Sequence, residues 1–444
     1  MKIYHLLSIF GLLLAGSSLS AGETVRINLS PDRPVLPAGE TQTVLIKVEV
    51  EGGELPEADR PPVNLSIIID QSGSMRGDRI HYARKGAIEA VRRLGSEDIF
   101  SLVVFDREVK TLIPAGPLGD VDQVIEVIQG IREGGTTNIH GGMTEGLNQL
   151  RKHDSDKYLH RAVLLSDGLA NVGPRSDEVF AELGREFAQH GIVVSTIGLG
   201  REYHESLLAS LAGAAEGNNY FVDNPSVLTK IFEEEIGHLV STVAQGVHLR
   251  IQLPDGVEIR RNLGRPLREE GSHLEIHFHD LGAGLRKHNL LELAVPAGAS
   301  EDLLDLITAE VTYRPVGQNR MERNQAQRQI RYSGNAEEVE KHVDVEVQAA
   351  FVTLLRAHLQ EEALEMVRQG KTTDAADMME REAASIGDMP LAPSATTDFQ
   401  QSLEEEQKLL RSRGYTREEM LYRQADAYQI RNQQSAGRKG KESE

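Results

Sequence analysis

Five oxygen-bearing side chains, at three separate places in the chain, could together hold a divalent cation. Asp70, Ser72 and Ser74 stand at alternate positions in DQSGSM, directly after the apolar run VNLSIIID. Thr137 lies in the glycine-flanked segment GGTTNIHGG, and Asp167 follows a second apolar run in RAVLLSDG. Because ligands of open α/β sheets lie beyond the carboxyl ends of the strands, we expect the three loops to meet at one rim.

The ligand types of this set indicate which ion it prefers. Two carboxylates and three hydroxyls, without nitrogen or sulfur, suit a hard cation, so we predict Mg²⁺ or Mn²⁺, with Ca²⁺ as a further option. Two acidic groups only neutralise a divalent ion, and hydroxyls add no charge. Such a site keeps water in an outer position, which a carboxylate from another protein can displace. We therefore expect a protein partner that binds through an acidic side chain.

In type and order these residues resemble the metal-ion-dependent adhesion site of the von Willebrand factor type A domain, written Asp-x-Ser-x-Ser, then Thr, then Asp. The resemblance covers residues 63 to about 243 and implies a doubly wound, Rossmann-like α/β fold that binds proteins through a cation. In adhesion members the last helix, here residues 225–243, can shift with ligand. The layout also looks like that of exported bacterial members of the family. The segment HDLGAGLRKHNLLELAVP of this chain resembles their β-domain motif, although Leu285 stands where a glutamate is expected.

Alternating apolar strands and amphipathic helices must position these residues. VNLSIIID, IFSLVVFD, RAVLLSDG and GIVVSTIGLG read as buried strands, NYFVD reads as a short last strand, and helices separate them. This order predicts a mainly parallel, doubly wound sheet.

The rest of the chain divides around this α/β unit. Strand periodicity before and after it predicts a β-sandwich-like domain in which the unit is inserted, and helical patterns follow. The expected parts are a signal peptide (1–21), N-terminal strands (22–60), the α/β domain (61–244), strands that pair with 22–60 (245–335), a helical hairpin (343–386), and a linker from 388 to 396 followed by charged helices and a disordered tail to 444.

The N-terminus has the order of a secretory signal. Lys2 precedes the apolar run LLSIFGLLLAG and the small residues SSLSA, so we expect cleavage near Ala21. An uncleaved anchor is the alternative, but the run is short for a membrane span. We expect a mature protein without a membrane span, located in the periplasm, secreted, or at the cell surface.

Composition excludes several classes of function. Acidic residues outnumber basic ones by 68 to 48, which gives a net charge of -20. A chain this acidic repels a phosphate backbone, so we expect no nucleic-acid partner. The absence of cysteine excludes disulfides, thiolate catalysis and zinc–thiolate sites.

Three other features have competing interpretations. Arg76-Gly77-Asp78 has the sequence of an integrin ligand, but its position favours a turn into a helix. Asp106 ends a strand on the same rim and is either a support for the site or a polar strand end. One face of a predicted strand holds His273, Glu275, His277 and His279. We favour a solvated surface for this face over a metal-binding pair of histidines.

The sequence favours a metal-dependent protein-binding module over two alternatives. One is a structural or assembly component with a vestigial metal site. The other, less favoured, is a Mg²⁺-dependent phosphohydrolase with Asp70 as nucleophile. Such enzymes need a second carboxylate two residues after the nucleophile, where this chain has Ser72. The Gly-x-Ser-x-Gly motif of serine hydrolases is also absent from the sequence. We therefore expect no enzymatic activity.

Overall fold

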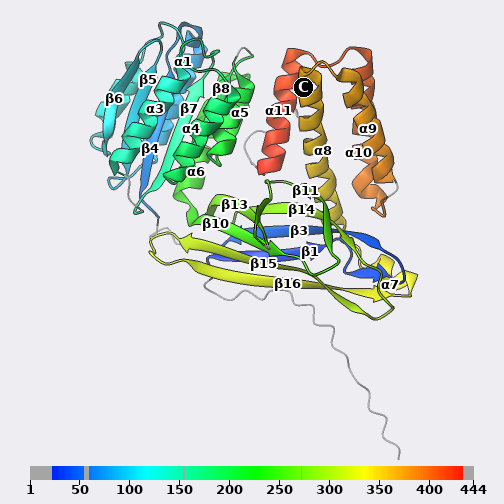
Figure 1. Cartoon of the computed structure of the whole chain (residues 1–444). Helices are drawn as coiled ribbons and strands as arrows, with labels where there is room; N and C mark the ends of the chain where they lie inside the picture. The colour runs from blue at the N-terminus through cyan, green and yellow to red at the C-terminus, as the bar shows by residue number, and fades with distance from the viewer. Residues whose placement is uncertain are drawn as a thin grey trace, which may run out of the picture.

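An α/β domain and a group of helices lie on the same side of a β-sandwich (Figure 1). The structure, a computed structural model, describes residues 23–54, 60–153, 156–201, 203–271, 273–387 and 389–433. The predicted signal peptide (1–21) and residues 434–444 lie outside this part of the chain.

The α/β domain has the strand order β6-β5-β4-β7-β8-β9. The strands are β4 (Val63–Asp70), β5 (Ile99–Phe105), β6 (Val109–Pro117), β7 (Leu159–Ser166), β8 (Ile192–Leu199) and β9 (Asn219–Val222). All neighbouring strands are parallel except β5 and β6. The predicted fold class is therefore confirmed, with an antiparallel edge strand that the prediction did not contain.

Helices cover both faces of this sheet. They are α1 (Asp78–Arg92), α2 (Val121–Gln129), α3 (Ile139–Leu150), α4 (Asp177–Gln189), α5 (Glu205–Ala214) and α6 (Leu228–Val240). Leu65, Ile67 and Ile69 pack into one core with α1, α2 and α6. Ile68 packs into the other core with α3, α4 and α5. The continuous apolar run of β4 follows from this, because both of its faces are buried.

The sandwich is built from segments on either side of the α/β domain in the sequence. One sheet has the order β1-β3-β14-β11 and the other β12-β13-β10-β15-β16-β2. The strands are β1 (Val25–Pro31), β2 (Val35–Pro37), β3 (Gln42–Gly52), β10 (Thr242–Gln252), β11 (Glu258–Leu263), β12 (Arg268–Glu270), β13 (His273–Gly282), β14 (Arg286–Val295), β15 (Leu303–Pro315) and β16 (Glu322–Ser333). Because β3 pairs with β14 along its length, the α/β domain is an insertion in the sandwich.

The turn between β13 and β14 joins the two places where the chain passes between the sandwich and the α/β domain. Gly52 N–H donates to Leu285 O at 3.0 Å, and Gly284 N–H donates back to Gly52 O at 3.0 Å. On the returning chain, Ala283 N–H donates to Ser241 O at 2.8 Å. The motif at residues 282–285 therefore holds both ends of the α/β domain together.

The short helix α7 (Ala336–Lys341) lies beside β2 and β16 of the six-stranded sheet. The C-terminal helices that follow it form one layer over the four-stranded sheet. They are α8 (Val345–Arg368), α9 (Thr372–Gly387), α10 (Pro393–Ser412) and α11 (Arg417–Asn432). Leu45 and Leu290 of the sheet share an apolar core with α8, α9, α10 and α11. The start of α10 at Pro393 lies inside the segment predicted to be a linker, and α10 and α11 complete the core of the predicted hairpin. Across the described residues, no helix combines the length and apolarity needed to cross a membrane.

Candidate metal-binding site

The two aspartates lie close together at the point of the sheet where the chain stops adding strands on one side of β4 and starts adding them on the other. From β4 the chain continues to β5 on one side, and β7 later lies on the other side. Asp70 is the last residue of β4, and Asp167 directly follows β7. The two residues are 0% and 1% exposed. Both carboxylates therefore lie at the switch point of the sheet, the usual place for a ligand in this fold.

The serines of the first loop connect these two carboxylates. Ser72 N–H donates to Asp70 Oδ1 at 2.8 Å, which turns the loop over the end of β4. The Oγ atoms of Ser72 and Ser74 are 3.0 Å apart, and Ser74 Oγ donates to Asp167 Oδ1 at 2.8 Å. Four of the five predicted ligands thus form one hydrogen-bonded chain.

Thr137 reaches the same place from the second loop. A Cβ atom added to Gly168 would lie 2.9 Å from Thr137 Oγ1 and 3.5 Å from Asp70 Oδ2, so both oxygens face the same small space beside that glycine. Thr137 N–H donates to Asn171 Oδ1 at 2.8 Å, which fixes the loop. The structure therefore brings all five predicted residues to one rim.

The loops that carry the five residues are tied to each other and to Asp106. Gly134 N–H donates to Gln71 O at 2.7 Å. Asp106 Oδ2 accepts a hydrogen bond from Gln71 Nε2 at 3.2 Å, and its carbonyl accepts one from Asn138 N–H at 2.9 Å. Asp106 thus contacts both loops, which favours the supporting role among its two interpretations.

The charge at this rim favours a cation. Burial raises the pKa of Asp70 to about 6, against the lowering effect of hydrogen bonds from Ser166 and Ser72, and the neighbouring Asp167 raises it further. Ser166 Oγ donates to Asp70 Oδ2 at 2.6 Å. The buried carboxylate of Asp70 is costly to ionise, and a divalent cation beside it would reduce that cost. The residues present therefore fit an ion of this kind.

Arg79 is a member of the site that the sequence analysis missed. Its Nη1 forms an ion pair with Asp167 Oδ2 and donates to Ser74 O at 3.2 Å. Arg79 is the second residue of α1, so only the docking of that helix reveals its contact. The only available signal was a basic residue in the first turn of the helix that follows the loop.

The Arg76-Gly77-Asp78 tripeptide forms the start of α1. Gly77 precedes the helix with a φ of +82°, a conformation that favours glycine, and Asp78 is the first helical residue. Arg76 forms an ion pair with Glu133 at 3.6 Å. The N-cap residue Gly77 makes no side-chain capping hydrogen bond, and Asp78 in the first turn contributes the favourable interaction of its charge with the helix N-terminus.

The histidine-bearing face of β13 differs from the expected solvated surface. Glu275 is 4% exposed, and His279 Nε2 lies 3.2 Å from Gly191 O of the α/β domain. His277 lies beside His248 of β10, with ring centroids 4.1 Å apart. His248 was missed because strand pairing, which the sequence does not show, brings it to this face.

The parallel sheet with helices on both faces defines the class of the domain, a doubly wound α/β fold. Residues 64–234 match the family model described as the von Willebrand factor type A domain, and the chain contains a domain of this family. Proteins with such domains are typically protein-interaction modules, and many bind a divalent metal.

The similarity to known proteins extends beyond this domain. The chain is 25% identical over 244 residues to an uncharacterized protein of Synechocystis, covering 53% of this chain and 57% of the relative. It is 28% identical over 264 residues to the uncharacterized protein YfbK of Escherichia coli, covering 57% of this chain and 45% of that relative. The match thus spans about half the length of these curated relatives.

A solved structure shares the whole fold. The von Willebrand factor type A protein from Catenulispora acidiphila superposes with a TM-score of 0.65 at 14% identity. The alignment covers 93% of this chain and 98% of that chain. The arrangement of α/β domain, sandwich and helices is therefore shared, while the identity is too low to transfer function.

Proposed function

We propose that the protein is an exported, metal-dependent protein-binding module for adhesion or assembly. Asp70, Ser72, Ser74, Thr137 and Asp167 would hold Mg²⁺ or Mn²⁺, with Ca²⁺ as a further option. The ion would supply an electrophilic position for a carboxylate of a partner protein. The observation that carries this proposal is the convergence of five oxygen side chains on one rim, with two carboxylates almost fully buried.

The direction from which a partner approaches follows from the exposure of the five residues. Asp70, Ser72, Thr137 and Asp167 are buried, whereas Ser74 is exposed. An acidic side chain would therefore reach the rim on the side of Ser74, next to the start of α1. Arg79 lies beside Ser74 and could also contact the incoming carboxylate.

The location of the protein rests on the N-terminal sequence pattern. Lys2, the following apolar run and the small residues before Ala21 support export and cleavage. We propose a periplasmic, secreted or cell-surface location, where a module of this kind would meet envelope or surface proteins.

Two observations bear on the alternatives. Both oxygens of Asp70 accept hydrogen bonds, from Ser72 N–H and Ser166 Oγ, and the side chain is fully buried, which disfavours Asp70 as a nucleophile. The ion pair of Arg79 with Asp167 instead suits an assembly component with a vestigial site, because a guanidinium can neutralise this carboxylate without a metal.

Calorimetric titration separates a working site from a vestigial one. Mg²⁺ and Mn²⁺ are titrated into the mature chain, into Asp70→Ala, and into Asp78→Ala as a control that removes an exposed aspartate from the same segment. We expect one ion per wild-type chain, the same affinity in Asp78→Ala, and at least about tenfold weaker binding in Asp70→Ala. Equal affinities in wild type and Asp70→Ala would refute the proposal.

A further inference from the structure

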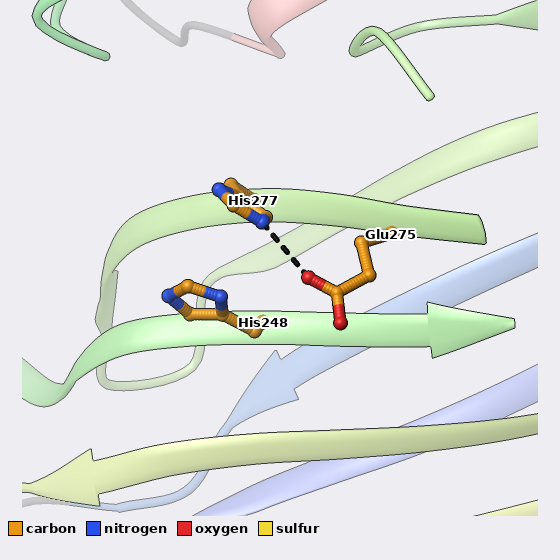
Figure 2. Close-up of side chains that lie close together, drawn as sticks. All are labelled: His248, Glu275 and His277. Carbon is orange, nitrogen blue, oxygen red and sulfur yellow. Dashed lines mark hydrogen bonds and ion pairs between the residues drawn. The ribbon is translucent and has the colours of Figure 1, made fainter. Parts of the chain in front are cut away.

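A second cluster of ligand-type side chains lies on the sandwich, away from the rim. His248 of β10 is the cross-strand partner of His277 of β13, and Glu275 lies two residues before His277 on the same face (Figure 2). The adjacent cross-strand pair, Leu249 and Ile276, packs in the sandwich core on the opposite face. Two paired strands of one sheet therefore hold the three side chains on its outer face.

The ligand atoms of this cluster are spaced for a single metal ion. One nitrogen from each histidine and one oxygen of Glu275 all lie within 4.8 Å of one another. His277 Nε2 is 3.2 Å from Glu275 Oε2. Ligands of a tetrahedral Zn²⁺ ion are about 3.3–3.5 Å apart, as bond lengths of about 2.0–2.1 Å require. Small side-chain rotations would therefore bring all three atoms into coordination distance.

Arg250 orients the carboxylate for this role. Its Nε and Nη2 donate to Glu275 Oε1 at 3.1 and 2.9 Å, which leaves Oε2 turned toward His277. Glu275 is 4% exposed, so its carboxylate is held in place by its surroundings. Carboxylate ligands of metals are usually hydrogen-bonded in this way, so that one oxygen is held by the protein while the other faces the ion.

One contact must change for a metal to bind. Arg268 Nη1 lies 2.9 Å from His277 Nδ1. If His277 coordinates through Nε2, then Nδ1 carries the proton and can no longer accept from Arg268. Arg268 belongs to the short, fully exposed strand β12, so its side chain can turn into solvent.

We propose that His248, Glu275 and His277 form a transition-metal site that is best suited to Zn²⁺. Two imidazoles and one carboxylate are softer than the oxygen-only set of the rim, so the two sites differ in ion preference. Three protein ligands leave a coordination position for water or for a side chain from a partner. Two residues further along β13, His279 contacts Gly191 of the α/β domain, so a bound ion would brace the strands beside that interface.

Zinc titration of untagged protein tests the site. The full mature chain carries Asp70→Ala throughout, so that the rim contributes nothing, and His248→Ala and His277→Ala are added singly. His273→Ala is the matched control, because His273 lies on the same face of β13 but outside the cluster. We expect one Zn²⁺ per chain in the Asp70→Ala background and in the His273→Ala control.

The two cluster variants should bind Zn²⁺ at least about tenfold more weakly, since even outer-shell partners of zinc ligands change affinity by about 10–100-fold. Thermal melting without metal confirms that the variants fold, and added Zn²⁺ should raise the melting temperature only where the cluster is intact. Unchanged zinc affinity in both cluster variants, or no zinc binding in the Asp70→Ala background, would overturn the proposal.

Visible absorption after Co²⁺ loading is a second measurement that needs no cluster variant. The Asp70→Ala protein should give the spectrum of a nitrogen- and oxygen-ligated Co²⁺ ion, and one equivalent of Zn²⁺ should abolish it. Absence of this spectrum would also contradict the site.

Discussion

At the scale of single residues, Arg79 and a cation would compete for the same charge. The guanidinium pairs with Asp167 Oδ2, and its side chain is 32% exposed, so it can move aside. We predict that Arg79→Met strengthens Mg²⁺ binding by about three- to tenfold, because a positive charge next to the ion is removed. Calorimetric titration measures this, with Arg76→Met as the control. Weaker binding by Arg79→Met would show instead that the guanidinium holds Asp167 in place.

The five rim residues could be predicted from local signals: Asp70, Ser72, Ser74 and Asp167 stand at or just after the ends of buried strands, and Thr137 lies in a glycine-flanked loop. Arg79 and Ser166 could not, since their roles depend on how α1 and β7 lie against the rim. The same holds for His248, which meets His277 only because β10 pairs with β13. Residues that act through a neighbouring element leave no pattern in their own segment.

At the scale of elements, the chain is tightly packed at Gly52, where it leaves the sandwich to enter the α/β domain. A Cβ added to Gly52 would clash with Gly282 O in the turn that joins both ends of the insertion. We predict that Gly52→Ala destabilises the protein by about 1–3 kcal/mol, the usual cost of overpacking. Gly237→Ala is the control: nothing lies within 4 Å of its added Cβ in α6. It should stabilise by about 0.5–1 kcal/mol, through the lower flexibility of alanine.

Thermal denaturation of both variants gives the comparison. A Gly52→Ala protein as stable as wild type would mean that the 282–285 turn moves freely and does not fix the insertion.

The strands and helices were predictable to different degrees. β4, β5, β7 and β8 are buried on both faces, and their continuous apolar runs identify them. β6 was not recognised, because it is an edge strand whose residues are all exposed or only partly buried. The N-terminal turn of α10 was assigned to a linker, because its proline-rich start has the composition of a loop although proline is favourable at the first helical position.

At the scale of the whole molecule, α11 links the helical layer to the α/β domain. Tyr428 Oη donates to Gly217 O at 2.8 Å, and Arg417 Nη2 donates to Tyr203 O at 3.2 Å. Arg201 and Glu418 form an ion pair across the same contact at 2.7 Å. The charged composition of the last helices thus reflects contacts between parts of the chain that are about 200 residues apart, which no local pattern could reveal.

The central claim, that a cation at the rim captures a protein carboxylate, is tested most directly by retrieval of partners from an envelope extract of the source organism. The immobilised mature chain is exposed to this extract with Mg²⁺, with Mg²⁺ and excess chelator, and as Asp70→Ala with Mg²⁺. We predict that a specific protein is retained by wild type with Mg²⁺ and lost in both other arms, while Asp78→Ala retains it. Retention of the same proteins in all arms would contradict the claim and favour an assembly surface that does not use the metal.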